Sequence, residues 1–208
     1  MMALTGLFLI LFLVVHLIGN LQLLKGDQGQ SFNIYAAFMT SNPLIIVISY
    51  VNYTAILVHV IWSILITRRN RKARGPEGYA VVKNSSHWTS RNMGILGTFI
   101  FIFLVIHLRS FWYEMHWGGI PTATYASGEY KDLYTVVDTA YADLWFVMLY
   151  VVSMALLAFH LFHGFGSAFQ TLGLNHVKYN PLIRFVGVAF AIIVPALFAL
   201  IPIYMYLN

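Results

Sequence analysis

The sequence predicts an all-α membrane protein with five transmembrane helices, organised as one domain over residues 1–208. Two compositional observations support this fold class: 60% of the residues are hydrophobic and only 9% are charged. Soluble proteins carry about 25% charged residues, so this chain has too few polar side chains to cover its surface in water. The third observation is five runs of about 20 apolar residues, the length at which a helix crosses a bilayer. Period-two alternation is absent, which argues against a transmembrane barrel and leaves helices as the predicted spans.

Charged residues and prolines delimit these runs. The first run ends before Lys25, the first charged residue of the chain. The second begins after Pro43 and ends at Arg68, and the fifth begins after Pro181. The third contains a single charged residue, Arg109. The predicted spans are 2–24, 44–67, 92–113, 144–166 and 182–206.

The connections between the spans differ in charge, and this difference predicts an orientation. Segment 68–91 holds seven basic residues against one acid, whereas segment 114–143 holds five acids against one base. The positive-inside rule then places 68–91 and the N-terminus in the cytoplasm and the C-terminus outside. The net charge of +5 is interpreted as this topology signal, and no nucleic-acid partner is expected. We also expect a short interfacial helix within 130–143, and a first span that is retained and not cleaved as a signal peptide.

Histidine is the residue type that points to chemistry. The chain has no cysteine, which excludes disulfides, cysteine-ligated iron–sulfur clusters and a thiol nucleophile. An ionisable side chain at membrane depth is costly, so a histidine inside a span is a functional candidate. Three of the eight histidines fall in connections and five fall inside predicted spans: His16, His59, His107, His160 and His163.

The depths of these histidines form a pattern. Spans one and three run outward, which places His16 about 12 Å and His107 about 9 Å below the outer edge of the bilayer. Spans two and four run inward, which places His59 about 12 Å and His160 about 9 Å from the inner edge. Helices that cross in the same direction sit diagonally in a four-helix bundle, and bundles build cofactor sites between facing helices. Each layer therefore offers two imidazoles across the bundle.

Two facing imidazoles are typical of a six-coordinate b-type haem, which carries electrons and does not bind oxygen. The pattern predicts two haems stacked along the membrane normal, held by His16 with His107 in the outer layer and His59 with His160 in the inner layer. The first four spans would form this haem-binding bundle. A single membrane histidine is more often a packing residue, but four at paired depths favour ligation. A hydroxylase or desaturase would instead gather histidines at one membrane face.

Several residues near these layers have two interpretations. His163 lies about 4.5 Å nearer the cytoplasm than His160, so we expect it to contact the inner haem and not to ligate it. Arg91 either neutralises haem propionates or anchors the inner interface. Ser167 and Gln170 follow His163 in the stretch HGFGSAFQTLG, which serves either the inner haem or helix packing. Arg109 either extends to the outer interface or meets the outer haem or a quinone.

These residues carry a resemblance to a known family. The chain resembles the five-helix, dihaem cytochrome b membrane anchor of succinate dehydrogenase and fumarate reductase over essentially its whole length. The resemblance rests on VVHLIGN, ILVHVIW, LVIHLRSFW and AFHLFHGFGSAFQTLG, one around each predicted ligand, and on SRNMG before the third span.

The resemblance implies an electron-transfer subunit of the bacterial inner membrane that does not itself carry out the dicarboxylate chemistry. It implies a flavoprotein subunit that carries FAD, an iron–sulfur subunit on the cytoplasmic face, and a membrane quinone, typically menaquinone, near the outer haem. By depth, the quinone candidates are Asn20, Gln22 and Arg109. The chain departs from some relatives in offering only Asp27 as an acid between the first two spans, and in having Ala158 two residues before the fourth ligand.

Two alternatives stay open. A dihaem cytochrome b could instead serve another membrane dehydrogenase, such as a hydrogenase or formate dehydrogenase. A haem-free transporter with a histidine proton relay is the alternative from a different class, although no predicted span holds a mid-membrane carboxylate to complete such a relay.

Overall fold

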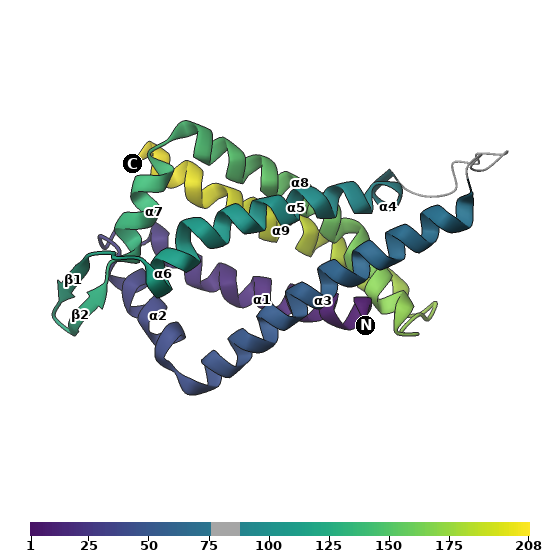
Figure 1. Ribbon diagram of the computed structural model, residues 1–208, viewed down its shortest axis with the longest axis horizontal. Helices are drawn as coiled ribbons and strands as arrows, with labels where there is room; N and C mark the ends of the chain where they lie inside the picture. The colour runs from purple at the N-terminus through teal and green to yellow at the C-terminus, as the bar shows by residue number, and fades with distance from the viewer. Residues whose placement is uncertain (76–87) are drawn as a thin grey trace.

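The computed structural model describes residues 1–75 and 88–208, and it is mostly helical (Figure 1). Within these residues, five helical segments are long and apolar enough to cross a membrane, as predicted. Most extend beyond the predicted boundaries by part of a turn to two turns. The segments are α1 (Met2–Asn20) with the 3-10 turn η1 (Leu21–Leu24), α3 (Pro43–Arg74), α5 (Met93–His107) with the π-turn η2 (Leu108–Trp112) and α6 (Tyr113–Trp117), α8 (Leu144–Thr171), and α9 (Asn180–Leu207).

The first four of these segments form a ring, in which each helix packs against its two neighbours. α1 contacts α3, α3 contacts α5, α5 contacts α8, and α8 contacts α1. The main diagonals of this ring are therefore α1 with α5 and α3 with α8. α9 packs outside the ring, along α8 and against α1 (Figure 1). Helices that cross in the same direction therefore lie diagonally, as predicted: α1 lies opposite α5, and α3 lies opposite α8.

Local sequence signals explain where the long helices begin. The Asn42 side chain accepts hydrogen bonds from the backbone N–H groups of Leu44 and Ile45, at 3.0 and 3.3 Å, and Pro43 occupies the first position of α3. Asp143 caps α8 in the same way by accepting from the Trp145 N–H at 3.0 Å. Such caps satisfy backbone donors that have no partner within the helix.

One end of the ring is covered by small elements that the hydrophobic runs did not predict. These are α2 (Gln30–Ser41), the hairpin of β1 (Thr122–Tyr125) and β2 (Gly128–Lys131), and α7 (Leu133–Tyr141). The strands pair antiparallel, with Thr122 opposite Lys131 and Tyr125 opposite Gly128. α7 is the short helix expected within 130–143. The two strands are four residues each, too short for their alternation to stand out in the sequence.

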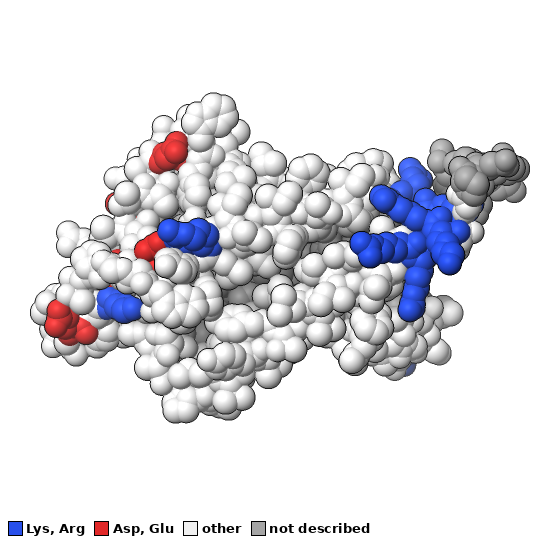
Figure 2. Space-filling view, viewed as in Figure 1, with Lys and Arg blue, Asp and Glu red and all other residues white. Residues whose placement is uncertain are grey.

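Charge is segregated between the two ends of the molecule (Figure 2). We call the end of the bundle that carries Arg68–Arg74, Arg91, Lys178 and Arg184 the basic end. The opposite end, which carries all six described carboxylates, is the acidic end; these are Asp27, Glu114, Glu129, Asp132, Asp138 and Asp143. Glu77, Lys83 and His87, which belong to the basic connection, lie outside the described residues.

The buried core and the exposed surface together indicate a membrane environment. The main buried cluster lies towards the acidic end, where Phe111, Tyr141 and Tyr150 pack together. By contrast, large apolar side chains are open along the spans: Leu11 is 63% exposed, Phe185 72% and Trp145 83%. Apolar surface of this extent is typical of a protein whose solvent is lipid.

Candidate cofactor site in the helical bundle

The histidine pair near the acidic end lies between the diagonal helices α1 and α5. The ring centroids of His16 and His107 are 5.7 Å apart, and the ring planes meet at 90°. Aromatic rings surround the pair: Phe12 stacks on His16 at 5.2 Å, and Phe103 lies 5.7 Å from His107. We call these two histidines the acidic-end pair.

The second pair lies nearer the basic end, between the other diagonal helices. The ring centroids of His59 on α3 and His160 on α8 are 6.4 Å apart, at an interplanar angle of 64°. On α8, the ring of His160 meets that of His59. We call His59 and His160 the basic-end pair. The structure thus brings together both pairs that the depth arithmetic expected.

Hydrogen bonds orient three of the four imidazoles. The Tyr150 hydroxyl lies 3.1 Å from His107 Nδ1, and the Thr5 hydroxyl lies 3.1 Å from His59 Nδ1. The Thr5 hydroxyl can donate to the backbone carbonyl of Met2 at 3.0 Å, so its oxygen is left to accept from His59 Nδ1–H. This arrangement favours the tautomer in which Nε2 of His59 carries no proton and is available as a ligand. At His16, the Asn20 amide nitrogen lies 3.4 Å from Nδ1 and donates to the backbone carbonyl of the same residue at 2.8 Å.

His160 differs from the other three because its Nδ1 atom is buried and has no hydrogen-bond partner in the described part of the chain. Buried polar atoms in folded proteins normally have a hydrogen-bond partner. A buried atom without one is typical of a site where a ligand or a water molecule binds. A second orphaned atom, the Thr89 hydroxyl on α4 (Trp88–Arg91), is also buried at the basic end. α4 packs against α8, and the Trp88 ring lies 5.9 Å from Phe159.

Glycines leave space beside the basic-end pair. A Cβ atom on Gly6 of α1 would stand 3.5 Å from the His59 ring, and a Cβ on Gly97 of α5 would stand 3.8 Å from the His160 ring. The two helices that flank the pair therefore present hydrogen atoms, and not side chains, towards these imidazoles. Glycine at such positions permits a close approach to a neighbouring group.

The donor set fits two bis-imidazole metal groups. A metal–imidazole bond is about 2 Å long, so two imidazoles that share one metal atom have centroids roughly 6 Å apart. The observed separations of 5.7 and 6.4 Å match this requirement. Over residues 1–75 and 88–208, three or more His, Cys, Asp or Glu side chains do not gather at one point, so a conventional multi-ligand metal site is not formed there. A haem would need only two protein ligands, which each histidine pair supplies.

The remaining candidates lie towards the basic end, on α4 and on α8 after His160. His163 follows His160 by one turn of α8 and is half-buried, and Arg91 ends α4. Ser167 is half-buried on α8, whereas Gln170 is exposed. No contact that the structure shows joins Ser167 or Gln170 to the histidine pair.

The acidic-end candidates separate into two groups. Asn20 contacts His16, as described above, and Gln22 lines a shallow groove of about 440 Å³ with Ser31, Ile34, Tyr35 and Phe38. Arg109 instead forms an ion pair with Glu114, and its guanidinium carbon lies 4.6 Å from the centre of the Tyr113 ring. The structure therefore brings Asn20, and not Arg109, to the acidic-end pair.

Thr5, Tyr150 and Thr89 were not found from the sequence. The depth along a helix, which predicted the histidine pairs, could also have pointed to Tyr150 and Thr5. Tyr150 precedes His160 by ten residues, about 15 Å along α8, which is the level of the acidic-end pair. Thr5 precedes His16 by 11 residues, about 16 Å along α1, which is the level of the basic-end pair. Only the structure shows that their hydroxyls face the imidazoles.

Comparisons of the chain with protein-family models, with curated proteins and with solved structures gave no match.

Proposed function

We propose that the chain is the dihaem cytochrome b membrane anchor of a succinate:quinone oxidoreductase, and that it passes electrons between an iron–sulfur subunit and a membrane quinone, typically menaquinone. The observation that carries this proposal is the presence of two histidine pairs at two depths, on the two diagonals of one four-helix ring, with ring separations of 5.7 and 6.4 Å. The quoted motifs around these histidines, and their order along the chain, supply the choice of family.

In this proposal, His16 and His107 hold one b-type haem, and His59 and His160 hold the other. A haem with two imidazole ligands supplies reversible one-electron chemistry and has no open iron position. The chain's own residues orient the ligands: Thr5 fixes the tautomer of His59, and Tyr150 holds the His107 ring. The surrounding aromatic and aliphatic side chains exclude water, and such burial tunes a redox potential.

The charge distribution supports the proposed partners. The basic end offers cations from α3, α4 and the start of α9, and no carboxylate of the described residues lies there. We propose that this end faces the cytoplasm of a bacterial cell and docks the iron–sulfur subunit, which in turn binds the FAD-containing flavoprotein. The quinone would bind at the acidic end, where Asn20, Gln22 and Arg109 are the candidate contacts.

The decisive experiment is a haem determination on the purified chain in detergent. We expect a reduced-minus-oxidised b-type spectrum and a pyridine haemochrome ratio of two haems per chain. His16→Ala and His107→Ala should each lose the acidic-end haem, and His59→Ala and His160→Ala should each lose the other. His163→Ala is the matched control on α8 and should keep both haems. A colourless preparation would contradict the proposal and favour the transporter alternative.

Co-purification separates the two dihaem alternatives. An anchor of the proposed type should be isolated from its native membrane with an FAD-containing flavoprotein, and its haems should be reduced by succinate. Reduction by hydrogen or formate, without a flavoprotein of that kind, would instead assign the chain to a hydrogenase or formate dehydrogenase.

A further inference from the structure

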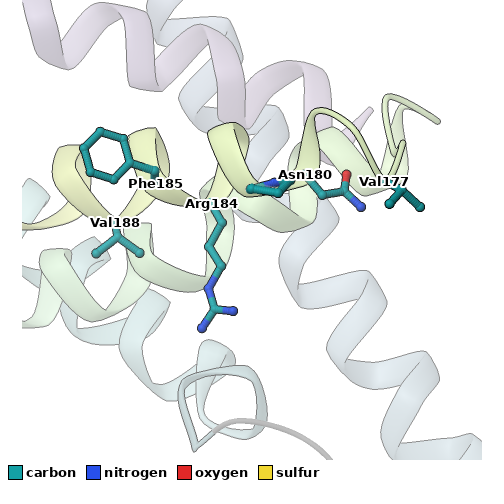
Figure 3. Close-up of a pocket in the computed structure, with 6 residues that line it drawn as sticks. Val177, Asn180, Arg184, Phe185 and Val188 are labelled. Atoms are coloured by element: carbon teal, nitrogen blue, oxygen red, sulfur yellow. The ribbon is translucent and has the colours of Figure 1, made fainter.

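An open groove lies at the basic end, on the outer side of the first turns of α9 (Figure 3). Its volume is about 620 Å³, and its lining combines apolar side chains with a single cation. The lining residues are Val177, Asn180, Pro181, Arg184, Phe185 and Val188. None of them belongs to the histidine pairs or to the candidate quinone contacts.

The position of Arg184 along α9 sets its depth in the membrane. Arg184 is the only charged residue of α9, and the uncharged stretch 185–207 follows it. These 23 residues extend about 34 Å, slightly more than the hydrocarbon thickness of about 30 Å. The Arg184 guanidinium therefore stands at the boundary between the hydrocarbon and the headgroups, at the level of lipid phosphates.

The charge of Arg184 is not compensated within the described chain. The one ion pair among the described residues joins Arg109 to Glu114 at the acidic end, and every described carboxylate lies at that end. Figure 3 shows the Arg184 side chain extending away from the axis of α9, and Arg184 is one of the residues that line the groove. A guanidinium in this position offers two parallel N–H donors to a phosphate.

The rest of the groove matches the other parts of a phospholipid. Val188 follows Arg184 by four residues and so lies on the same face of α9, one turn deeper in the hydrocarbon. Asn180 lies one turn towards the aqueous side; its side-chain oxygen accepts from the His176 N–H at 3.1 Å, which leaves its amide N–H₂ group as a donor for a headgroup. Lys178 adds a second cation nearby, with its ammonium 5.6 Å from the centre of the Tyr179 ring.

We propose that this groove is a binding site for one anionic glycerophospholipid of the leaflet at the basic end. Arg184 pairs with the lipid phosphate, Asn180 donates to the headgroup, and an acyl chain lies against Val188. Basic pockets of transmembrane helices at the cytoplasmic side are suited to anionic headgroups. The proposal concerns α9, outside the four-helix ring, and it holds whether or not the histidine pairs bind haem.

The test compares lipid retention by the full-length chain. The purified protein is exposed to micelles that contain equal amounts of phosphatidylglycerol and phosphatidylcholine, and native mass spectrometry then counts the lipids that stay bound. We expect the wild-type chain to retain phosphatidylglycerol selectively. Arg184→Leu should lower this retention about fivefold to tenfold, and Arg184→Lys should lower it less because a single ammonium replaces the bidentate guanidinium.

Arg69→Leu is the matched control, since it removes one cation from the same end but away from the groove, and it should leave retention unchanged. Val188→Trp keeps every charge and fills the groove, so it should also lower retention even if Arg184→Leu fails to fold. Equal retention of the two lipids, equal losses in Arg69→Leu and Arg184→Leu, or unchanged retention in Val188→Trp would each overturn the proposal.

A photo-crosslinking residue at position 177 distinguishes a lipid from a protein occupant in native membranes. Val177 is 87% exposed and borders the groove, so it can carry a benzophenone side chain without loss of packing. We expect lipid adducts. A protein adduct at this position would show that a partner subunit covers the groove and would overturn the lipid assignment.

Discussion

The four histidines of the bundle are distinguished by what their Nδ1 atoms meet. His107 meets a phenol, His59 meets a threonine hydroxyl, His16 meets the Asn20 amide nitrogen, and His160 meets no partner among the described residues. A hydrogen bond from Nδ1–H makes an imidazole a more basic ligand and fixes its orientation. The two proposed haem sites are therefore expected to differ in potential because of these contacts.

The first prediction concerns the phenol. Tyr150→Phe removes the one oxygen of the described residues that lies against His107 Nδ1 and leaves that buried atom without a partner there. We expect both haems to stay bound, the potential of the acidic-end haem to rise, and the chain to lose about 1–3 kcal/mol of stability. A redox titration measures the potentials. Tyr141→Phe, which changes a neighbouring ring 5.2 Å away, should leave both potentials in place.

The second prediction concerns Thr5. Thr5→Val keeps the shape of the side chain but removes the oxygen that accepts from His59 Nδ1–H. The potential of the basic-end haem should rise while that of the acidic-end haem stays constant, and Thr5→Ser should restore the wild-type value. If Thr5→Val and Thr5→Ser gave the same potential, the role assigned to the hydroxyl would be wrong.

At the scale of elements, a single buried amide joins the small elements that cover the acidic end. Asn33 of α2 is fully buried. It donates to the Tyr125 hydroxyl on β1 and to Asp132 Oδ1, both at 2.9 Å, and it accepts from the Tyr134 N–H of α7 at 2.9 Å. One side chain thus fixes the mutual positions of α2, the hairpin and α7.

This network predicts a pH dependence at the acidic end. Partial burial raises the pKa of Asp132, but hydrogen bonds from Thr135 and Asn33 outweigh this effect and hold the pKa below its ordinary value of 3.8. A depressed carboxyl pKa contributes stability at higher pH, and this contribution is lost as the pH falls through the folded-state value. Hydrogen-exchange protection of α7 should therefore drop in acid below pH 3.8. Asp132→Asn should remove this dependence, whereas Asp138→Asn should keep it.

The glycines of α1 and α5 give a prediction about the space beside the basic-end pair. Gly6→Leu places a branched side chain at a position where even a Cβ atom would stand 3.5 Å from the His59 ring. We expect loss of the basic-end haem with retention of the other, measured as a haemochrome ratio of one per chain. Gly119→Leu is the control, because a Cβ at that exposed position, far from the basic-end pair, meets no atom within 4 Å. Two haems in Gly6→Leu would mean that the space is not needed.

The sequence predicted the long helices, the pairing of histidines and the short helix α7, but not α2 or the hairpin at the acidic end. Runs of apolar residues and positions such as His16 and His59 depend only on helix length and rise, which are fixed by backbone geometry. The contact between Asn33 and Asp132 joins residues 99 positions apart, and the contact between Thr5 and His59 joins residues 54 apart. Such pairings depend on helix rotation and loop path, which no local pattern determines.

At the scale of the whole molecule, the charges are arranged along the long axis of the bundle (Figure 2). α3 illustrates this arrangement: its 32 residues extend about 48 Å, so its basic last turns stand clear of a hydrocarbon layer of about 30 Å. Basic residues beside a span resist translocation, and the basic end is therefore expected on the cytoplasmic side.

The absence of cysteine allows a direct test of this topology. Single cysteines are introduced as Asn70→Cys at the basic end and Ser127→Cys in the turn of the hairpin. A membrane-impermeant maleimide applied to intact bacterial cells should label position 127, and it should label position 70 only after the inner membrane is opened. The reverse pattern would place the basic end outside and would contradict the proposed docking side for the iron–sulfur subunit.

The π-turn after His107 has a consequence for chains of different length. A π-turn accommodates one residue more than a regular helical turn, and each residue of an α-helix advances the side-chain direction by about 100°. Deletion of one residue from positions 108–111 would convert the π-turn into a regular helical turn, so His107 and Trp112 should keep their directions and the 2.8 Å hydrogen bond from Trp112 to Tyr53 should persist. A chain that lacks the extra residue is therefore expected to keep both the histidine at this level of the third span and the link from the third span to the second.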